Sequence, residues 1–204
     1  MNKNNIKIEG RKIGFDHPPF IIADMSGNHN QSLDRAMAIV EAAAKAGAHA
    51  VKLQTYTADT MTLDIAEREF FINDPDSLWK GKSLYELYEE AYTSWEWHKP
   101  IFDRCRELGL IYLSTPFDET AVNFLEELDV PCYKIASFEN TDIPLIRKVA
   151  ATGKPLNIKN VKDRQELAQF HHQLTYDSSW DKNLNKDTTS MIAVPLPYKK
   201  KLVG

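Results

Sequence analysis

The sequence has few cysteines and no long apolar run, as is usual for an ordinary globular protein. Its 204 residues include only two cysteines, Cys105 and Cys132, without the paired spacing of a zinc site, so a disulfide-stapled miniprotein is excluded. No window approaches the roughly 18 consecutive apolar residues of a membrane span, and residues 1–10 lack the apolar block of a signal peptide. We therefore expect a cytoplasmic protein with free thiols and without a membrane partner.

An excess of charge of either sign is also missing. The 25 basic and 29 acidic side chains give a formal net charge of -4, which supplies no field that would collect nucleic acid or anionic lipid. A chain with 43% hydrophobic and 26% charged residues is neither disordered nor collagen-like. The glycine-rich phosphate loops of nucleotide-binding proteins and the Gly-x-Ser-x-Gly turn of serine hydrolases are absent from the sequence as well. A small-molecule partner is the expectation that remains.

Patterns typical of strands and of helices alternate five times along the chain. The expected strands are residues 20–23, 50–54, 110–113, 132–135 and 156–158, and the expected helices are residues 33–46, 83–92, 95–108, 119–128 and 144–151. Ser32 is a suitable N-cap for the first helix and Gly47 a suitable stop. The second strand follows so soon that the crossover predicts a parallel pair. This alternation is typical of α/β barrels and of open doubly wound sheets, and it does not distinguish between them.

Two stretches depart from this alternation. Residues 55–82 are irregular, and we expect a long insertion with a short helical piece near residues 65–71. Residues 161–174 have the pattern of one more helix, residues 175–190 are polar, and residues 191–204 are expected to form a loosely ordered tail.

Lysines, hydroxyls and an amide gather where the expected strands end. They are Lys52, Gln54, Ser114, Thr115, Lys134 and Ser137. A lysine inside a strand of a two-sided sheet costs desolvation unless an anion meets it. Either of the two lysines could form a buried salt bridge or reach solvent at a strand edge. Two of them with hydroxyls at matching strand ends favour a phosphate or carboxylate site.

Carboxylates end the first and fourth strands and are candidates for an acid, a base or a hydroxyl anchor. Asp24 and Glu139 would face the same mouth of a barrel, although each could instead be a loop or helix-cap carboxylate. His29 is the histidine best placed for function, with an ordinary loop histidine as the alternative. The other histidines pair in no metal-ligand pattern, and His17, His49 and His98 are expected at the surface or at helix ends.

Four motifs in this order resemble the sialic acid synthase family. They are residues 19–29 (PFIIADMSGNH), 51–56 (VKLQTY), 114–117 (STPF) and 133–139 (YKIASFE). Three further stretches are most similar to the pseudaminic acid synthase branch, namely residues 54–57 (QTYT), 83–88 (SLYELY) and 95–98 (WEWH). The resemblance covers about residues 6–155.

The resemblance implies a TIM-barrel enzyme that uses a divalent cation, Mn²⁺ or Mg²⁺. Such an enzyme condenses phosphoenolpyruvate with the open-chain aldehyde of an N-acylated amino sugar, which gives a nonulosonic acid and phosphate. By similarity, the phosphoenolpyruvate anion would be held by Lys52, Thr115, Lys134 and Ser137. Gln54 would contact the sugar, and the catalytic carboxylates would be Asp24 and Glu139, the latter orienting water or moving a proton.

The chain also departs from the family pattern. Asp24 stands where the family usually has Glu, and Lys159 stands where it has a phosphate-binding Ser. The two histidines that bind the family's metal have no counterparts, and neither has the C-terminal antifreeze-like domain through which family members form homodimers.

We therefore expect an α/β fold that comprises the N-terminal part of a TIM barrel, about five βα units over residues 1–155, followed by a divergent tail over residues 156–204. Such a chain could be a truncated, inactive remnant or a phosphoenolpyruvate-binding fragment of a synthase. A different phosphoenolpyruvate-dependent aldol enzyme of the barrel type is a further alternative.

Overall fold

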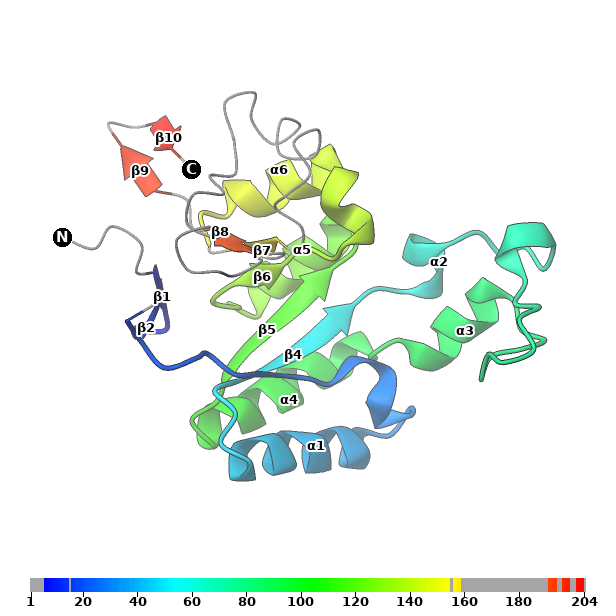
Figure 1. Cartoon of the computed structure of the whole chain (residues 1–204), viewed down its shortest axis with the longest axis horizontal. Coiled ribbons are helices and arrows are strands. Elements are labelled where there is room, and N and C mark those ends of the chain that lie inside the picture. The colour runs from blue at the N-terminus through cyan, green and yellow to red at the C-terminus, as the bar shows by residue number, and fades with distance from the viewer. Residues whose placement is uncertain are drawn as a thin grey trace. The chain divides into compact units, whose positions relative to one another are not determined.

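The computed structural model describes residues 6–14, 16–154, 156–158, 191–193, 196–198 and 201–203 (Figure 1). The chain divides into two compact units, one formed by Pro19–Ala121 and the other by Met1–Pro18 with Val122–Gly204. The helix expected over residues 161–174 and the polar stretch 175–190 lie outside the described residues. No helix among the residues that are described is long and apolar enough to cross a membrane.

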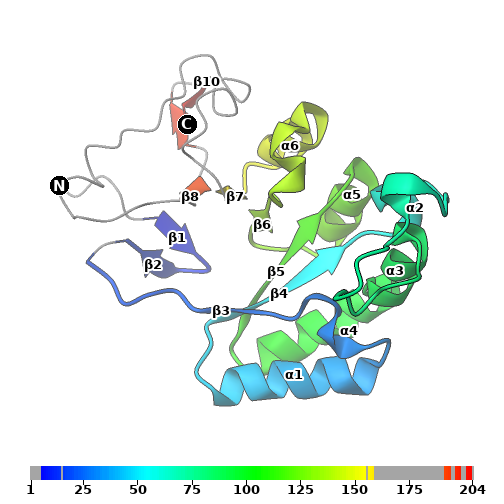
Figure 2. The same ribbon diagram turned by 45° about the vertical axis from the view of Figure 1, so that its right-hand side comes forward.

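Three parallel strands form the sheet of the unit Pro19–Ala121. They are β3 (Ile22–Asp24), β4 (Ala50–Thr55) and β5 (Ile111–Pro116), in the order β3-β4-β5. The parallel pairing of β3 with β4 confirms the crossover predicted from the sequence. Helices α1 (Leu33–Lys45) and α4 (Trp95–Glu107) lie side by side along one face of these strands in both views (Figures 1 and 2).

The boundaries of α1 follow from ordinary capping chemistry. The Ser32 hydroxyl accepts a hydrogen bond from the Arg35 backbone N–H, as expected of an N-cap. Gly47 follows the end of the helix with φ +80°, a conformation that glycine adopts without strain. The stripe formed by Ala36, Val40 and Ala43 is buried, so the apolar spacing of the sequence sets which face of α1 packs inward.

The insertion between β4 and α4 contains the helix expected over residues 83–92 and one short helix that the sequence pattern does not predict. It holds α2 (Ala58–Met61), the 3₁₀ turn η2 (Arg68–Phe70) and α3 (Leu84–Ala91). The turn η2 is the helical piece expected near residues 65–71. The Ser83 hydroxyl accepts from the Glu86 N–H while the Glu86 carboxylate accepts from the Ser83 N–H, which makes a capping box for α3.

The second unit contains several short elements. They are β1 (Ile6–Ile8), β2 (Arg11–Ile13), β6 (Tyr133–Lys134), η3 (Phe138–Thr141), α6 (Ile143–Ala151), β7 (Leu156–Ile158), β8 (Met191–Ala193), β9 (Leu196–Tyr198) and β10 (Lys201–Val203). Helix α5 (Glu119–Glu127) spans the division between the units. Strand β6 pairs in parallel with β7, as an α/β fold requires, whereas β7–β8, β1–β2 and β9–β10 are antiparallel pairs that the sequence pattern did not predict.

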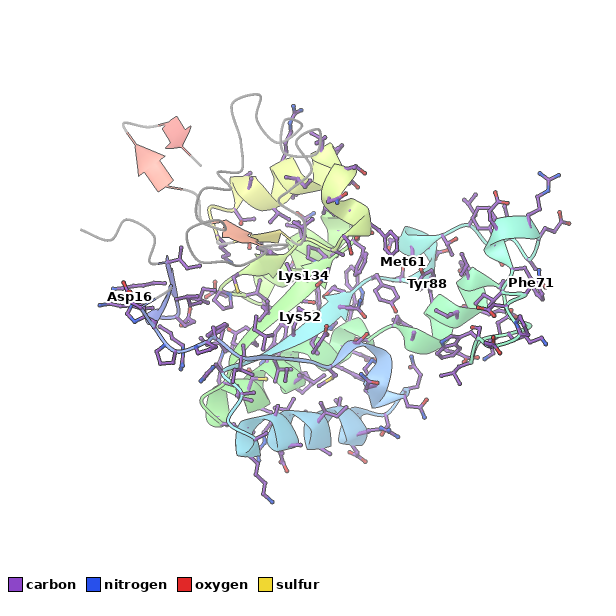
Figure 3. The ribbon with its side chains drawn as sticks, in the orientation of Figure 1. Asp16, Lys52, Met61, Phe71, Tyr88 and Lys134 are labelled. Carbon is purple, nitrogen blue, oxygen red and sulfur yellow. The ribbon has the colours of Figure 1, made fainter. Side chains whose placement is uncertain are left out.

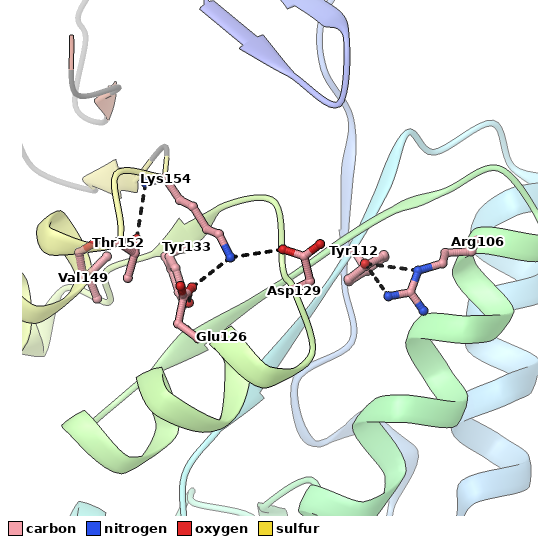
Figure 4. A network of polar contacts seen from close by, with 8 residues as sticks. All are labelled: Arg106, Tyr112, Glu126, Asp129, Tyr133, Val149, Thr152 and Lys154. Carbon is pink, nitrogen blue, oxygen red and sulfur yellow. Dashed lines mark hydrogen bonds and ion pairs between the residues drawn. The ribbon is translucent and has the colours of Figure 1, made fainter. Parts of the chain in front are cut away.

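Polar contacts join α5 to β6 in the second unit (Figure 4). The Lys154 ammonium lies 2.8 Å from Glu126 Oε1 and 3.4 Å from Asp129 Oδ1, and the Tyr133 hydroxyl donates to the same Glu126 carboxylate. Burial, reinforced by this carboxylate, raises the pKa of Tyr133, so the phenol stays protonated. The buried apolar side chains of this unit include Leu125, Val130, Leu145, Ile146 and Val149.

Candidate functional site

The strand register collects four predicted site residues on one face of the sheet. Asp24 of β3 is the register partner of Lys52 in β4, and Gln54 of β4 is the partner of Thr115 in β5. Register partners in parallel strands project to the same side, and so do residues two apart in one strand. Asp24, Lys52, Gln54 and Thr115 therefore share a face, which we call the strand-end face, and Figure 3 shows Lys52 on β4.

The Lys52 ammonium is matched by one carboxylate. Its Nζ lies 2.8 Å from Asp24 Oδ2, with the Lys52 side chain 10% exposed and the Asp24 side chain 55% exposed. The sequence left a salt bridge and an anionic ligand open as partners for this lysine, and the structure shows the salt bridge. Because the Asp24 carboxylate is half exposed, water can solvate it when another anion takes its place beside the nearly buried Lys52 ammonium.

Gln54 and Thr115 keep hydrogen-bonding capacity on the strand-end face. Ser26 Oγ donates to Gln54 Oε1 over 2.9 Å, which turns the amide so that its NH₂ group can serve another acceptor. Thr115 is fully buried, and its Oγ1 has no hydrogen-bond partner among the residues that the structure describes. A buried hydroxyl without a partner is costly, and a functional role is one of the reasons for which native proteins retain such groups.

Ser114 lies on the opposite face of the sheet from Thr115. Its Oγ is 2.7 Å from Thr55 Oγ1, and Thr55 Oγ1 is 2.8 Å from Nε2 of His98 in α4. The two hydroxyls that stand together in the sequence therefore have different surroundings, because side chains alternate along a strand. Ser114 bonds toward the helix, and Thr115 belongs to the strand-end face.

Of the two places expected for His98, the helix end is confirmed, since the residue lies in the first turn of α4, and the surface is wrong. The residue is fully buried, because it belongs to the same face of α4 as Ile101, Phe102 and Cys105, at the spacing of a helical stripe. Burial lowers the pKa of His98 to about 4, so the ring is neutral at pH 7. His29 is also fully buried, 3.0 Å from Thr93 Oγ1 through its Nε2, and burial lowers its pKa too.

The remaining predicted site residues belong to the second unit. Lys134 ends β6 and Ser137 precedes η3, and both are half-buried. Glu139 lies in η3, and its Oε2 is buried without a hydrogen-bond partner among the described residues. Burial raises the pKa of Glu139, and the charge of Lys134 opposes that shift. A carboxyl group with a raised pKa keeps its proton to a higher pH than an ordinary carboxyl group does, which suits it to proton transfer.

The residues that the structure describes contain no candidate metal site. No group of three or more histidine, cysteine, aspartate or glutamate side chains gathers there in a way that could hold a metal ion. The described residues therefore do not fit the divalent cation that the resemblance implies.

Comparison with known proteins gives consistent matches. The NeuB family model matches residues 39–179. The pseudaminic acid synthase of Helicobacter pylori is 48% identical over 139 residues, which cover 68% of this chain and 40% of the relative. An uncharacterized protein of Methanocaldococcus jannaschii is 35% identical over an alignment that covers 98% of this chain and 60% of the relative. The family match continues beyond residue 155, where the recognisable motifs end.

A solved structure extends the likeness to the fold. The N-acetylneuraminic acid synthetase of Leptospira borgpetersenii, in complex with citrate, superposes with a TM-score of 0.68 at 25% identity and covers 83% of this chain and 55% of that one. The fold is thus α/β and corresponds to the N-terminal part of a TIM barrel. The chain spans about 40% of the length of the curated pseudaminic acid synthases it matches.

Proposed function

Because the chain belongs to the NeuB family, we propose that it acts as a nonulosonic acid synthase of the pseudaminic or sialic acid type, with phosphoenolpyruvate bound on the strand-end face. The observation that carries the proposal is that one face presents both a nearly buried ammonium, that of Lys52, and the buried Thr115 hydroxyl, which has no hydrogen-bond partner among the described residues. Phosphoenolpyruvate carries both a carboxylate and a phosphate, and such groups are bound through charge-assisted hydrogen bonds.

Each residue on the face has a part in this proposal. Lys52 neutralises the anion, the Thr115 hydroxyl donates to it, and the free NH₂ of Gln54 donates to a sugar oxygen. Asp24 leaves Lys52 when the anion binds and accepts a hydrogen bond from a sugar hydroxyl.

The reaction forms one carbon–carbon bond. The enol carbon of phosphoenolpyruvate attacks the sugar aldehyde, water adds to the resulting cationic carbon, and the tetrahedral intermediate expels phosphate. The resemblance assigns the proton transfer from that water to Glu139 and the binding of the anion also to Lys134 and Ser137. The raised pKa of Glu139, which burial causes, is compatible with that role. The described residues do not fit a metal, so no step is assigned to one.

A binding measurement tests the anion site. We expect isothermal titration calorimetry to detect phosphoenolpyruvate binding to the wild-type chain and Lys52→Gln to weaken it by at least about tenfold, because a nearly buried charge meets the ligand. Lys99→Gln is the matched control, since Lys99 is 71% exposed and paired with Asp103 on α4. Equal affinity in wild type and Lys52→Gln, or no binding by the wild type, would contradict the proposal.

Turnover is a separate proposal, because the chain spans about 40% of its curated relatives. Release of phosphate from phosphoenolpyruvate with an N-acylated amino-sugar aldehyde, and not with a sugar phosphate, would support a nonulosonic acid synthase. Binding without phosphate release would favour the alternative of a phosphoenolpyruvate-binding chain that does not turn over alone.

A further inference from the structure

A directional hydrogen-bond chain crosses from β5 through β4 to α4, on the opposite side of the sheet from the strand-end face. His98 Nδ1 lies 3.1 Å from the Ser94 backbone oxygen, which can only accept, so Nδ1 carries the hydrogen. In the neutral ring Nε2 is then an acceptor, and the Thr55 hydroxyl donates to it over 2.8 Å. Thr55 has spent its only hydrogen, so Ser114 donates to Thr55 Oγ1.

The second buried histidine has the opposite tautomer. The Gln31 backbone N–H donates to His29 Nδ1 over 3.3 Å, which leaves the hydrogen on Nε2, and Nε2 donates to Thr93 Oγ1. His29 belongs to η1 (Ser26–His29), the turn that follows Asp24 and β3, and Thr93 lies just before α4. Residues 93–98, at the start of α4, are therefore hydrogen-bonded to the turn after β3 and to the end of β4. The end of β5 is bonded to them through Thr55.

A third hydrogen bond joins the start of α4 to the end of β4. Trp95 Nε1, in the first turn of α4, donates to the backbone oxygen of Tyr56 over 3.2 Å, one residue beyond Thr55. The last residue of β4 and the residue after it are therefore both bonded to the start of α4. Thr55 follows Gln54 directly in the chain, and Ser114 precedes Thr115, so the network constrains the backbone of the two residues that face each other on the other side.

We propose that His98 is a positioning residue: its Nδ1–H tautomer holds Thr55 and Ser114 so that Gln54 and Thr115 present their polar groups to the ligand on the strand-end face. The inference rests on the proposed function, since the ligand in question is phosphoenolpyruvate. Apolar side chains would fill the same volume without fixing a direction, whereas a satisfied buried network specifies one arrangement. A displacement of about 1 Å at a binding group can cost on the order of a hundredfold in activity. A network that fixes the positions of Gln54 and Thr115 therefore matters for binding.

The tautomers can be measured without any ligand. In a ¹⁵N-labelled sample at pH 7, we expect two-bond ¹H–¹⁵N correlations to show His98 with a protonated Nδ1 and a bare Nε2, and His29 with the reverse assignment. A protonated Nε2 on His98 would overturn the inference, because Thr55 could not then donate to the ring.

The functional part is tested on three variants by calorimetry with phosphoenolpyruvate. Thr55→Val keeps the shape and removes the donor, and we expect it to weaken binding about tenfold, a loss of roughly 1.4 kcal/mol. Thr55→Ser restores the hydroxyl and should return the affinity to within about twofold of wild type, which packing alone would not do. Val40→Ala, in the buried stripe of α1, lowers thermal stability without touching the network and should also bind within about twofold of wild type.

The outcomes distinguish a failure of the positioning role from a failure of the proposed function. If wild type binds phosphoenolpyruvate and Thr55→Val binds equally well, or if Val40→Ala loses as much affinity as Thr55→Val, the positioning role is overturned while the proposed function stands. If wild type does not bind, the proposed function fails and the positioning role falls with it, whereas the tautomer measurement still decides the direction of the hydrogen bonds.

Discussion

Lys52 places a positive charge inside a strand, where charge is expensive, and a single half-exposed carboxylate compensates it. The sequence predicted that an anion would meet this lysine and left its identity open between a protein carboxylate and a ligand. The two alternatives can hold in turn: Asp24 pairs with Lys52 when no ligand is bound, and an anionic ligand would compete with Asp24 for the same ammonium group. Asp24 is one methylene shorter than the Glu usual in the family, and it nevertheless reaches Lys52.

Removal of the competing charge at Asp24 should therefore tighten anion binding. We expect Asp24→Asn to bind phosphoenolpyruvate up to about fivefold more tightly than wild type, since the ligand no longer has to displace a carboxylate that water partly solvates. Asp24→Glu, which restores the charge, should bind close to wild type. Calorimetric titration of all three proteins checks this, and weaker binding by Asp24→Asn would mean that the carboxylate helps to hold the ligand instead.

The Thr115 hydroxyl has no hydrogen-bond partner in the described part of the chain, so its removal should affect stability and binding in opposite directions. Thr115→Val removes a buried polar group that lacks a partner, so we expect the free energy of unfolding to rise by about 1 kcal/mol. Phosphoenolpyruvate should bind at least about fivefold more weakly, because a hydrogen bond to a charged ligand is lost. Thermal unfolding and calorimetry measure the two effects. A less stable variant with unchanged affinity would show that Thr115 serves the core rather than the ligand.

At the scale of elements, the sequence predicts those whose boundaries depend on local chemistry. The cap at Ser32, the stop at Gly47 and the apolar runs of β4 and β5 have local causes, and these elements were found where expected. The hairpin β1–β2 was not predicted, because strands of three residues leave too short a pattern around the turn at Gly10.

Two features of the candidate site were missed although the sequence held their signal. Alternation along β5 separates Ser114 from Thr115, and the spacing of His98 with Ile101 and Cys105 places it on the buried face of α4. The four residues of the strand-end face follow from strand ends and register. Their roles in binding stay predictions, because the periodicity of a sequence does not report which ligand a polar side chain contacts.

The capping box of α3 gives a test at this scale. Ser83→Ala removes the acceptor for the Glu86 N–H, and we expect it to lower the free energy of unfolding by about 1 kcal/mol. Ser94→Ala is the matched control, because Ser94 is the N-cap of α4 but makes no side-chain capping bond, and it should cost less. Urea denaturation of both variants measures the difference, and equal losses would show that the box contributes nothing beyond an ordinary serine.

At the scale of the whole molecule, the predicted site residues are divided between the two compact units, with Asp24, Lys52, Gln54 and Thr115 in one and Lys134, Ser137 and Glu139 in the other. The alternation of strands and helices could not choose a barrel over an open sheet, since both place polar residues at strand ends. The four ordered motifs predict a barrel, and the likeness to a solved sialic acid synthetase confirms this fold.

Buried histidines also make the stability of the molecule depend on pH. The unfolded chain protonates His98 near its ordinary pKa of 6.5, whereas the folded chain does so only near 4. Between these values the unfolded state binds more protons, so stability is complete above pH 6.5 and falls as the pH drops toward 4. His29, whose pKa burial also lowers, acts in the same direction.

From pH 7 to pH 5, above the range where most carboxylates titrate, we expect the free energy of unfolding to fall by about 2 kcal/mol through His98. His98→Gln keeps an acceptor for Thr55 but cannot be protonated, so its stability should change less over this range. Val40→Ala is less stable at every pH and should keep the wild-type slope, because it leaves His98 buried. Urea denaturation at several pH values compares the three slopes, and equal slopes in wild type and His98→Gln would mean that protonation of this ring does not limit the stability of the fold.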